Sequence, residues 1–402
     1  MIPTQPVTRS WALRFNLAWL AVMIGLFGPI QILLPNQAAA LAPDAKEAAL
    51  GMVSAVGAAL SLVANPLWGA LSDRTMSRFG RRVPWIVIGG GAGALGLLVL
   101  ATAPSLPVMV LGWALVQTAM NAPWAALTAV VPDQVPRAQR GAVSGYLGLA
   151  QLVGVLVATG LATLVPGPAG YAVCAVVMLL GLVPFVIGQR DDRTEDPPPA
   201  WQWGTFLRGF WVSPRRHPDF AWAWLTRFLI NLGYAAATVY LLYFLRDVLR
   251  SEHAEADLLL VTGVTTVCTP LAVLVSGRWS DKLDRRRIFV SAAGVVMAAG
   301  SVLLAVAPTW GVLLVVAAVL GFGTGIFTAV DFSLITLVLP DGAAAGKDMG
   351  VLNVANSMPQ VLAPALAAPI VVSPGGYPAL FVVSGVLCLA GALLVHRIRS
   401  VA

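Results

Sequence analysis

The sequence contains very little charge. Only 11 % of its residues are Asp, Glu, Lys or Arg, whereas about 25 % are charged in soluble domains. Cysteine and histidine are also scarce, with three residues of each type. These residues are Cys174, Cys268, Cys388, His217, His253 and His396. They show no paired or clustered spacing, so we expect no disulfide framework, no metal site and no cofactor. A membrane enzyme is disfavoured for the same reason.

Long apolar runs take the place of charged surface. Apolar residues make up 58 % of the chain, and a helix needs about 20 of them in succession to cross roughly 30 Å of hydrocarbon. The sequence contains twelve such runs, which predicts an all-α integral membrane protein. The expected spans are 15–34, 48–70, 84–103, 106–130, 141–165, 170–189, 220–245, 257–277, 288–307, 310–338, 348–371 and 376–396.

The placement of positive charge predicts the orientation. Of the 25 Lys and Arg residues, 21 fall in the terminal segments and in alternate loops on one side of the expected spans. Lys46, Arg246 and Arg250 lie on the opposite side, and Arg227 lies within a span. The positive-inside rule then predicts cytoplasmic termini in the cell (inner) membrane. The net charge of +7 therefore indicates a lipid bilayer as partner and not nucleic acid, and we expect a monomer.

The start of the chain could be taken for a signal peptide, because a basic residue and an apolar run precede Ala38-Ala39-Ala40. The apolar run is about 18–20 residues long, however, and the apolar core of a signal peptide usually has 7–15. We therefore interpret this run as the first membrane span.

A short segment occurs twice. Residues 69–82 (GALSDRTMSRFGRR) and 277–287 (GRWSDKLDRRR) share Gly-x-x-Ser-Asp, with the aspartates 208 positions apart (281 − 73). Residues 131–133 and 339–341 repeat at the same interval. Two parallel repeats in a membrane chain are typical of secondary transporters, whose substrate site lies between the repeats near mid-membrane.

The repeat predicts two six-helix halves, 1–189 and 220–402, around a central cavity. A cytoplasmic linker at 190–219 would join them. Its acidic start and the prolines at 197–199 favour an extended connector. The aromatic residues within 201–211 indicate either a short helix in the membrane interface or an ordered loop packed beneath the halves.

The repeated loop suggests a gating role. Gly69 and Gly80 would permit close approach and tight turning, while Asp73 lies at a helix end where Arg74 or a facing helix N-terminus could hold it. Such a pair would latch the halves together on the inner side. Alternatively, the basic residues only anchor the topology against anionic headgroups. The candidate gating residues are Gly69, Asp73, Arg74, Gly80, Arg81, Arg82, Asp281, Lys282 and Arg285.

The form Gly-x-Leu-x-Asp-Arg-x5-Gly-Arg-Arg in 69–82 resembles the cytoplasmic loop signature of the major facilitator superfamily. That resemblance implies the major facilitator fold, with helices 1, 4, 7 and 10 lining the central cavity. Residues 78–85 (RFGRRVPW), and the segment from Pro132-Asp133 to Arg140-Gly141, are similar to the variant found in sugar carriers of the glycoside–pentoside–hexuronide and sucrose type.

Three departures from this pattern bear on the cargo. Sodium-coupled sugar carriers have aspartates in helices 1 and 2, but 15–34 and 48–70 contain none, so sodium coupling is disfavoured. Sucrose-type carriers have an arginine in helix 4, but 106–130 contains no basic residue. The fifth-helix signature of drug–proton antiporters is absent as well. The identity of the solute and the direction of its transport therefore stay open.

Two charged residues, Asp331 and Arg227, lie well inside the expected spans. Asp331 and Arg227 each fall six to seven residues from the inner end of a span, or roughly 10 Å deep at 1.5 Å per residue. Opposite charges at equal depth predict an ion pair, and charges in a bilayer are functional candidates. Because a carboxylate can be neutralised by a proton, we assign proton coupling to Asp331 and Arg227. For Arg227, a static ion pair and a contact with the substrate both stay open.

Amide and aromatic side chains mark a candidate solute site. Their hydrogen bonds and an aromatic platform suit a hydroxyl-rich solute, although each amide could instead form a structural bond between helices. The candidates are Gln117, Asn121, Trp124, Asn231, Tyr234, Asn356 and Gln360. The expected function is secondary active transport by alternating access, with proton-coupled sugar or glycoside uptake as the first interpretation. Proton-coupled export of drugs or secondary metabolites is the alternative.

Overall fold

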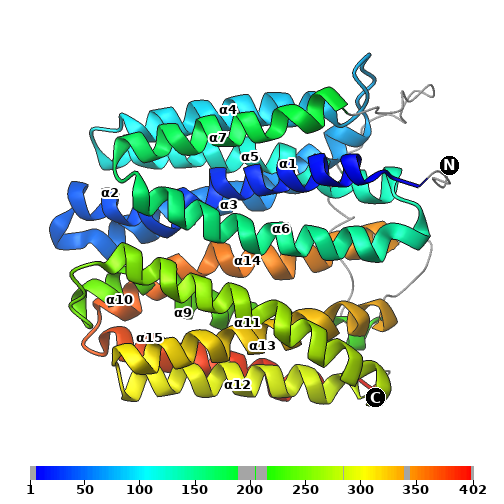
Figure 1. The fold of residues 1–402 in the computed structure, drawn as a ribbon. Helices are drawn as coiled ribbons and strands as arrows, with labels where there is room; N and C mark the ends of the chain where they lie inside the picture. Colours follow the sequence, from blue (N-terminus) through cyan, green and yellow to red (C-terminus); the bar gives the residue numbers. More distant parts are fainter. Residues whose placement is uncertain (1–5, 189–203, 205–214, 284, 339–344, 400–402) are drawn as a thin grey trace. The chain divides into compact units, whose positions relative to one another are not determined.

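The computed structural model describes residues 6–188, 204, 215–283, 285–338 and 345–399, and contains helices but no strand within them (Figure 1). The chain divides into two compact units, Met1–Ala200 and Trp201–Ala402. The first unit contains α1 (Arg9–Gly28), the π-helical turn η1 (Pro29–Leu33), α2 (Leu34–Leu41), η2 (Pro43–Ala45), α3 (Lys46–Asp73), α4 (Val83–Ala101), α5 (Leu106–Gln134), α6 (Arg137–Leu164) and α7 (Pro168–Gly188). The second unit contains α9 (Pro218–Val239), α10 (Leu241–Asp247), α11 (Ala254–Leu283), α12 (Arg286–Val306), α13 (Trp310–Val338), α14 (Ala345–Val372), α15 (Gly376–Leu394) and η3 (Val395–Arg397).

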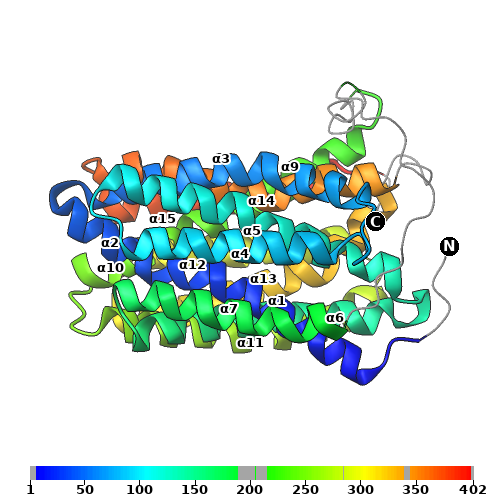
Figure 2. The same cartoon turned by 90° about the horizontal axis from the view of Figure 1, so that it is seen from above.

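Twelve helical segments in the described part of the chain are long and apolar enough to cross a membrane, six in each unit. The longest is Arg9–Leu41, which runs through α1, η1 and α2. The helices of each unit run lengthwise beside one another (Figures 1 and 2). The all-α membrane class and the number of spans predicted from the apolar runs are confirmed.

The two units repeat the same helix packing. In the first unit the most extensive contacts join α4 to α5, α3 to α5, α1 to α6, α1 to α7 and α4 to α7. In the second unit they join α12 to α13, α11 to α13, α9 to α14, α9 to α15 and α12 to α15. Helices in the same order therefore pack in the same pairs, which is the equivalence that the repeated sequence segments predict.

The first and seventh spans are interrupted at corresponding positions. A π-helical turn at Pro29–Leu33 separates α1 from α2, and Tyr240, with φ −108° and ψ 20°, separates α9 from α10. Tyr240 lies 208 positions after Ile32, the same interval as in the sequence repeat. Proline explains the first interruption because it lacks an N–H and crowds the preceding turn. At the second, the Tyr240 hydroxyl donates to the carbonyl of Pro364 on α14 at 3.1 Å.

Close helix contacts fix α9 and α13 within the second unit. A Cβ at Gly233 of α9 would lie 2.7 Å from the carbonyl oxygen of Ser384 on α15, and a Cβ at Gly325 of α13 would lie 2.4 Å from that of Thr269 on α11. Both distances are too short for a side chain, so glycine is required for these approaches. The Ser384 hydroxyl also donates to the carbonyl of Gly233 at 2.7 Å. These two helices carry Arg227 and Asp331.

The predicted linker at 190–219 lies outside the described residues except for Gly204 and residues 215–219. The aromatic residues of 201–211 all lie outside the described residues as well. The helix that follows, α9, begins at Pro218 with Asp219 in its first turn, which suits the positive end of a helix dipole.

Candidate functional site

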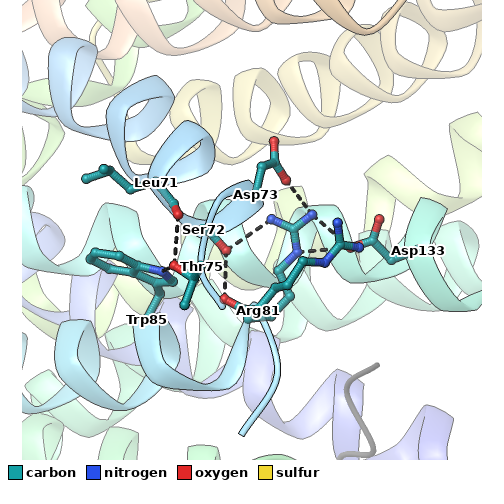
Figure 3. Close-up of polar contacts among 8 residues, drawn as sticks. Leu71, Ser72, Asp73, Thr75, Arg81, Trp85 and Asp133 are labelled. Carbon is teal, nitrogen blue, oxygen red and sulfur yellow. Dashed lines mark hydrogen bonds and ion pairs between the residues drawn. The ribbon is translucent and has the colours of Figure 1, made fainter. Parts of the chain in front are cut away.

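Arg82 is the centre of an ion-pair network at the loop between α3 and α4, and Figure 3 labels its partners Ser72, Asp73 and Asp133. Its Nη2 lies 2.6 Å from Oδ1 of Asp73 and 2.8 Å from Oδ2 of Asp133. Its Nε donates to the same Asp133 oxygen at 2.9 Å, and its Nη1 donates to the hydroxyl of Ser72 at 3.0 Å. The Arg82 side chain is 3 % exposed, while the Asp73 side chain is 59 % exposed.

The surroundings of Arg82 favour its charged form. Burial alone would lower the pKa of the guanidinium. The carboxylates of Asp133 and Asp73 outweigh that effect, so the pKa of Arg82 lies above its ordinary value. The network thus places a permanent positive charge between the ends of α3 and α5, immediately before α4 begins at Val83.

Further bonds stabilise the loop. Arg81 contacts Asp133 as well, with Nη2 at 3.2 Å from Oδ2. On the other side of the loop, the indole of Trp85 donates to the Thr75 hydroxyl at 2.7 Å, and that hydroxyl donates to the carbonyl of Leu71 at 2.8 Å (Figure 3). The loop therefore joins three helix ends within the first unit.

The predicted loop residues have mixed outcomes. The structure pairs Asp73 with Arg82, whereas the sequence suggested Arg74 or a helix N-terminus. Gly80 has φ 87°, which confirms the tight turn. The close approach expected at Gly69 is wrong among the described residues, because a Cβ there would meet only Ala125 Cβ at an ordinary 3.9 Å. A latch between the halves stays a prediction.

The second copy of the loop differs. The side chains of Asp281 and Lys282 lie outside the described residues, and the exposed Arg285 precedes the first residue of α12 without a capping bond from its side chain. Arg287 is the last residue of this copy, as Arg82 is of the first. Its Nη1, however, donates to the carbonyl of Ile398 at 2.8 Å. Ile398 is fully buried, and the neighbouring Arg399 N–H donates to Oδ1 of Asp219 at 3.1 Å.

Asn121 on α5 is part of an amide cluster in the first unit. Its Nδ2 donates to the hydroxyl of Ser61 at 2.7 Å and to the carbonyl of Gln117 at 2.7 Å. Its Oδ1 accepts from Nδ2 of Asn65 at 2.9 Å. Asn121 is 7 % exposed. These bonds link α5 to α3, and the structural interpretation of Asn121 is the one that this geometry favours.

The predicted ion pair between Arg227 and Asp331 is present. Nε of Arg227 lies 3.2 Å from Oδ2 of Asp331, and the side chains are 13 % and 7 % exposed. The same Nε donates to Oδ1 of Asn356 at 2.7 Å. Nδ2 of Asn231 donates to that oxygen at 3.1 Å and to the carbonyl of Arg227 at 2.9 Å. We call these four residues, from α9, α13 and α14, the Arg227 cluster.

The orientation of Asn356 follows from its partner. Arginine has only donors, so the Asn356 atom that faces Nε of Arg227 must be the amide oxygen. That oxygen accepts from both Arg227 and Asn231, and the amide NH₂ of Asn356 is left as a donor. Asn231 uses its own NH₂ in two bonds, and its Oδ1 is left as an acceptor.

The other predicted solute-site residues lie near one or the other cluster. The half-buried Gln117 packs its Cγ against Gly57 of α3, where a Cβ would approach to 3.0 Å. Trp124 meets Trp19 of α1 edge to face, with ring centroids 5.3 Å apart. In the second unit Tyr234 follows Asn231 by three residues on α9, and the exposed Gln360 follows Asn356 by one helical turn on α14.

Sequence reasoning missed several members of these sites. The sequence predicts Asp133 only as part of a repeated motif, and no prediction from the sequence includes Ser61 or Asn65. The last two lie one turn apart on α3 within an apolar span, and this spacing could have indicated a polar face. Trp19 was missed too: its indole N–H is buried and has no partner among the described residues.

The helical architecture and its internal polar groups define a class of protein. Twelve apolar spans in two equivalent sets, with an ion pair and amides inside the spans, are the features of a membrane carrier. The model of the Major Facilitator Superfamily matches residues 15–263 and 252–401. The chain therefore belongs to this superfamily, and it is a multi-pass transporter rather than an enzyme.

Solved structures support the same fold. A crystal structure of a mutant of the nucleoside transporter NupG aligns with a TM-score of 0.75 and 12 % identity, covering 96 % of this chain and 99 % of that one. A crystal structure of the peptide transporter POT in complex with sulfate aligns with a TM-score of 0.76 and 15 % identity, covering 99 % and 96 %. The search of curated proteins gave no match.

Proposed function

We propose that this carrier takes up a sugar or glycoside together with protons by alternating access. The observation that carries the proposal is the Arg227–Asp331 ion pair inside a span, with the amides of Asn231 and Asn356 beside it. A charge in the membrane interior is costly unless it has a function or a partner. Amides supply the donors and acceptors that hydroxyl groups need.

Asp331 is the proposed proton carrier. When Asp331 takes up a proton it loses its charge, and its attraction to Arg227 is lost with it. The Arg227 side chain is then released to change partners, which couples protonation to a rearrangement of the cluster. Gln117, Tyr234 and Gln360 would add hydrogen bonds to the solute, and Trp124 with Trp19 would provide an aromatic platform.

The proposed topology and location of the protein are those predicted from the sequence. We place both termini in the cytoplasm, the protein in the inner membrane as a monomer, and the two halves at 1–189 and 220–402 on either side of the 190–219 linker. Within this scheme, the loop of Asp73 and Arg82 is a gate that ties helix ends on the inner side. The resemblance of residues 78–85 to sugar carriers supports the choice of solute.

Proton-coupled export of an amphipathic drug or metabolite is the second candidate. The edge-to-face contact between Trp19 and Trp124 favours it, because indole faces bind flat apolar molecules as well as sugar rings. In either case the transported molecule would be small and organic.

The test is transport by the purified protein in liposomes with an alkaline interior. We expect accumulation of at least one labelled compound from a panel of glucose, sucrose, methyl glucoside and the sugar acid glucuronate. Asp331→Asn should abolish accumulation against a gradient but keep exchange of solute between the two sides. Asp44→Asn, at an exposed residue of η2, is the matched control and should leave both activities unchanged.

Two results would contradict the proposal. Equal loss of accumulation and exchange in Asp331→Asn would assign this residue to solute binding or folding and not to proton coupling. Binding of amphipathic drugs, without accumulation of any sugar, would favour the exporter. The ion pair itself is tested by a double substitution: Arg227→Gln with Asp331→Asn should impair folding less than the sum of the single changes, because each single change leaves a buried charge without its partner.

A further inference from the structure

The Arg227 cluster offers a solute more donors than acceptors. Nε of Arg227 is engaged by Asp331 and Asn356. The terminal nitrogens Nη1 and Nη2 have no hydrogen-bond partner among the described residues. The NH₂ of Asn356 likewise has no partner among the described residues, and Asn356 is exposed. Against these N–H groups, the cluster offers fewer acceptors: Oδ1 of Asn231 and the second oxygen of Asp331, whose side chain is 7 % exposed.

A neutral sugar does not match this set. Each hydroxyl is both a donor and an acceptor, so a sugar that bound here would find few acceptors for its own hydrogens. A carboxylate has two acceptor oxygens in one plane and no donor when ionised. The edge of a guanidinium formed by Nη1 and Nη2 presents two parallel N–H groups at matching spacing.

We propose that Arg227 binds a carboxylate of the solute through Nη1 and Nη2, so that the solute is a hydroxylated organic acid. The inference rests on the proposed function and specifies its substrate class. The amides of Asn356 and Gln360, one helical turn apart on α14, then bind the hydroxyl groups beside the carboxylate.

The charges of the cluster set the proton stoichiometry. With Asp331 ionised, the cluster is neutral, and a bound carboxylate would bring an excess negative charge into a region where charge is costly. One proton on Asp331 restores neutrality. The proton comes from the aqueous phase that supplies the solute and leaves on the opposite side, so one proton and one carboxylate cross together without net charge movement.

Matched pairs of compounds test the binding step. The melting temperature of the purified protein is measured with glucuronate against glucose, gluconate against sorbitol, and benzoate against benzyl alcohol. A ligand that binds the folded protein raises this temperature. We expect stabilisation by at least one hydroxylated acid and by none of the neutral partners, and little effect of benzoate because it lacks hydroxyl groups.

Variants then assign the effect to Arg227. Arg227→Gln should abolish stabilisation by the acid, and Arg227→Lys should weaken its affinity at least tenfold, because lysine cannot form the paired contact. Arg9→Gln, at an exposed residue at the start of α1, is the control. Since the ligand-free melting temperature reports folding, a loss of binding in a variant that folds is meaningful. If Arg227→Gln does not fold, Arg227→Lys decides.

Several outcomes overturn the inference. These are equal stabilisation by an acid and its neutral partner, full retention of acid binding in Arg227→Gln or Arg227→Lys, and a panel in which no acid binds. Uptake into liposomes separates this failure from failure of the proposed function. Proton-driven accumulation of glucose that increases with an inside-negative potential would refute the acid and keep sugar uptake. Accumulation of glucuronate that responds to the pH gradient and not to the potential supports the inference, and accumulation of no solute refutes both.

Discussion

We expect the two aspartates of the Arg82 network to contribute unequally to the free energy of unfolding. Asp73 belongs to the repeated motif and would be the obvious residue to mutate. Its side chain is 59 % exposed, however, and it receives one contact from Arg82. Ion pairs at such exposed positions contribute about 0–1 kcal/mol. We therefore expect Asp73→Ala to lower the free energy of unfolding by less than about 1 kcal/mol.

Asp133 should matter more. Its side chain is 24 % exposed, and one of its oxygens contacts Nε and Nη2 of Arg82 and Nη2 of Arg81. Removing it takes two contacts from the guanidinium of Arg82, which is 3 % exposed, and leaves the contacts with Asp73 and Ser72 in place. Breaking one side of a buried ion pair costs about 3–5 kcal/mol. Because Asp73 keeps part of the compensation, we expect Asp133→Ala to cost about 3 kcal/mol.

The assay is thermal and chemical unfolding of the two variants in the same detergent, with transport measured in parallel. The reasoning depends on the order and not on the absolute values. If Asp73→Ala destabilises the protein as much as Asp133→Ala, burial of Arg82 is not what makes the network stable. A large loss of transport in a fully stable Asp73→Ala variant would instead place Asp73 in the gate, as its motif suggests.

Three other predictions concern single positions. Asn121→Ala should lower stability by about 1 kcal/mol, the value of two average bonds between membrane helices, and leave the solute affinity of the folded protein unchanged in binding assays. Gly80→Ala should cost about 1–2 kcal/mol in unfolding experiments, since φ 87° is a left-handed conformation; no loss would show that the loop rearranges easily. Gly325→Ala should reduce both melting temperature and transport, because its Cβ would force α13 away from α11. Gly311→Ala on the same helix, where a Cβ meets nothing within 4 Å, should have little effect.

The sequence alone predicted the features that depend on distance along one helix. The positions of the twelve spans follow from hydropathy, and the pairing of Arg227 with Asp331 follows from their equal depth from the inner ends of two spans. Depth can be counted at a fixed rise per residue, without knowing which side chains surround each charge. The type of fold likewise follows from a repeat that is visible in the residues themselves.

What could not be predicted depends on which faces of different helices meet. Arg81 and Arg82 are adjacent and chemically identical, and only the packing of α3, α4 and α5 determines that Arg82 is the buried one. Asn121 looked like a solute ligand because its partners, Ser61 and Asn65, lie about 60 residues away. Whether a polar residue in a span serves a solute or a neighbouring helix is decided by its rotation about the helix axis, which hydropathy does not specify.

The two copies of the loop also differ in when they can be completed during synthesis. The contacts of Arg82 with Ser72, Asp73 and Asp133 can form while later spans are still being made. Arg287 must wait for Ile398, more than a hundred residues later. Until then the starts of α9 and α12 lack the segment that joins them, so this end of the second unit is completed last.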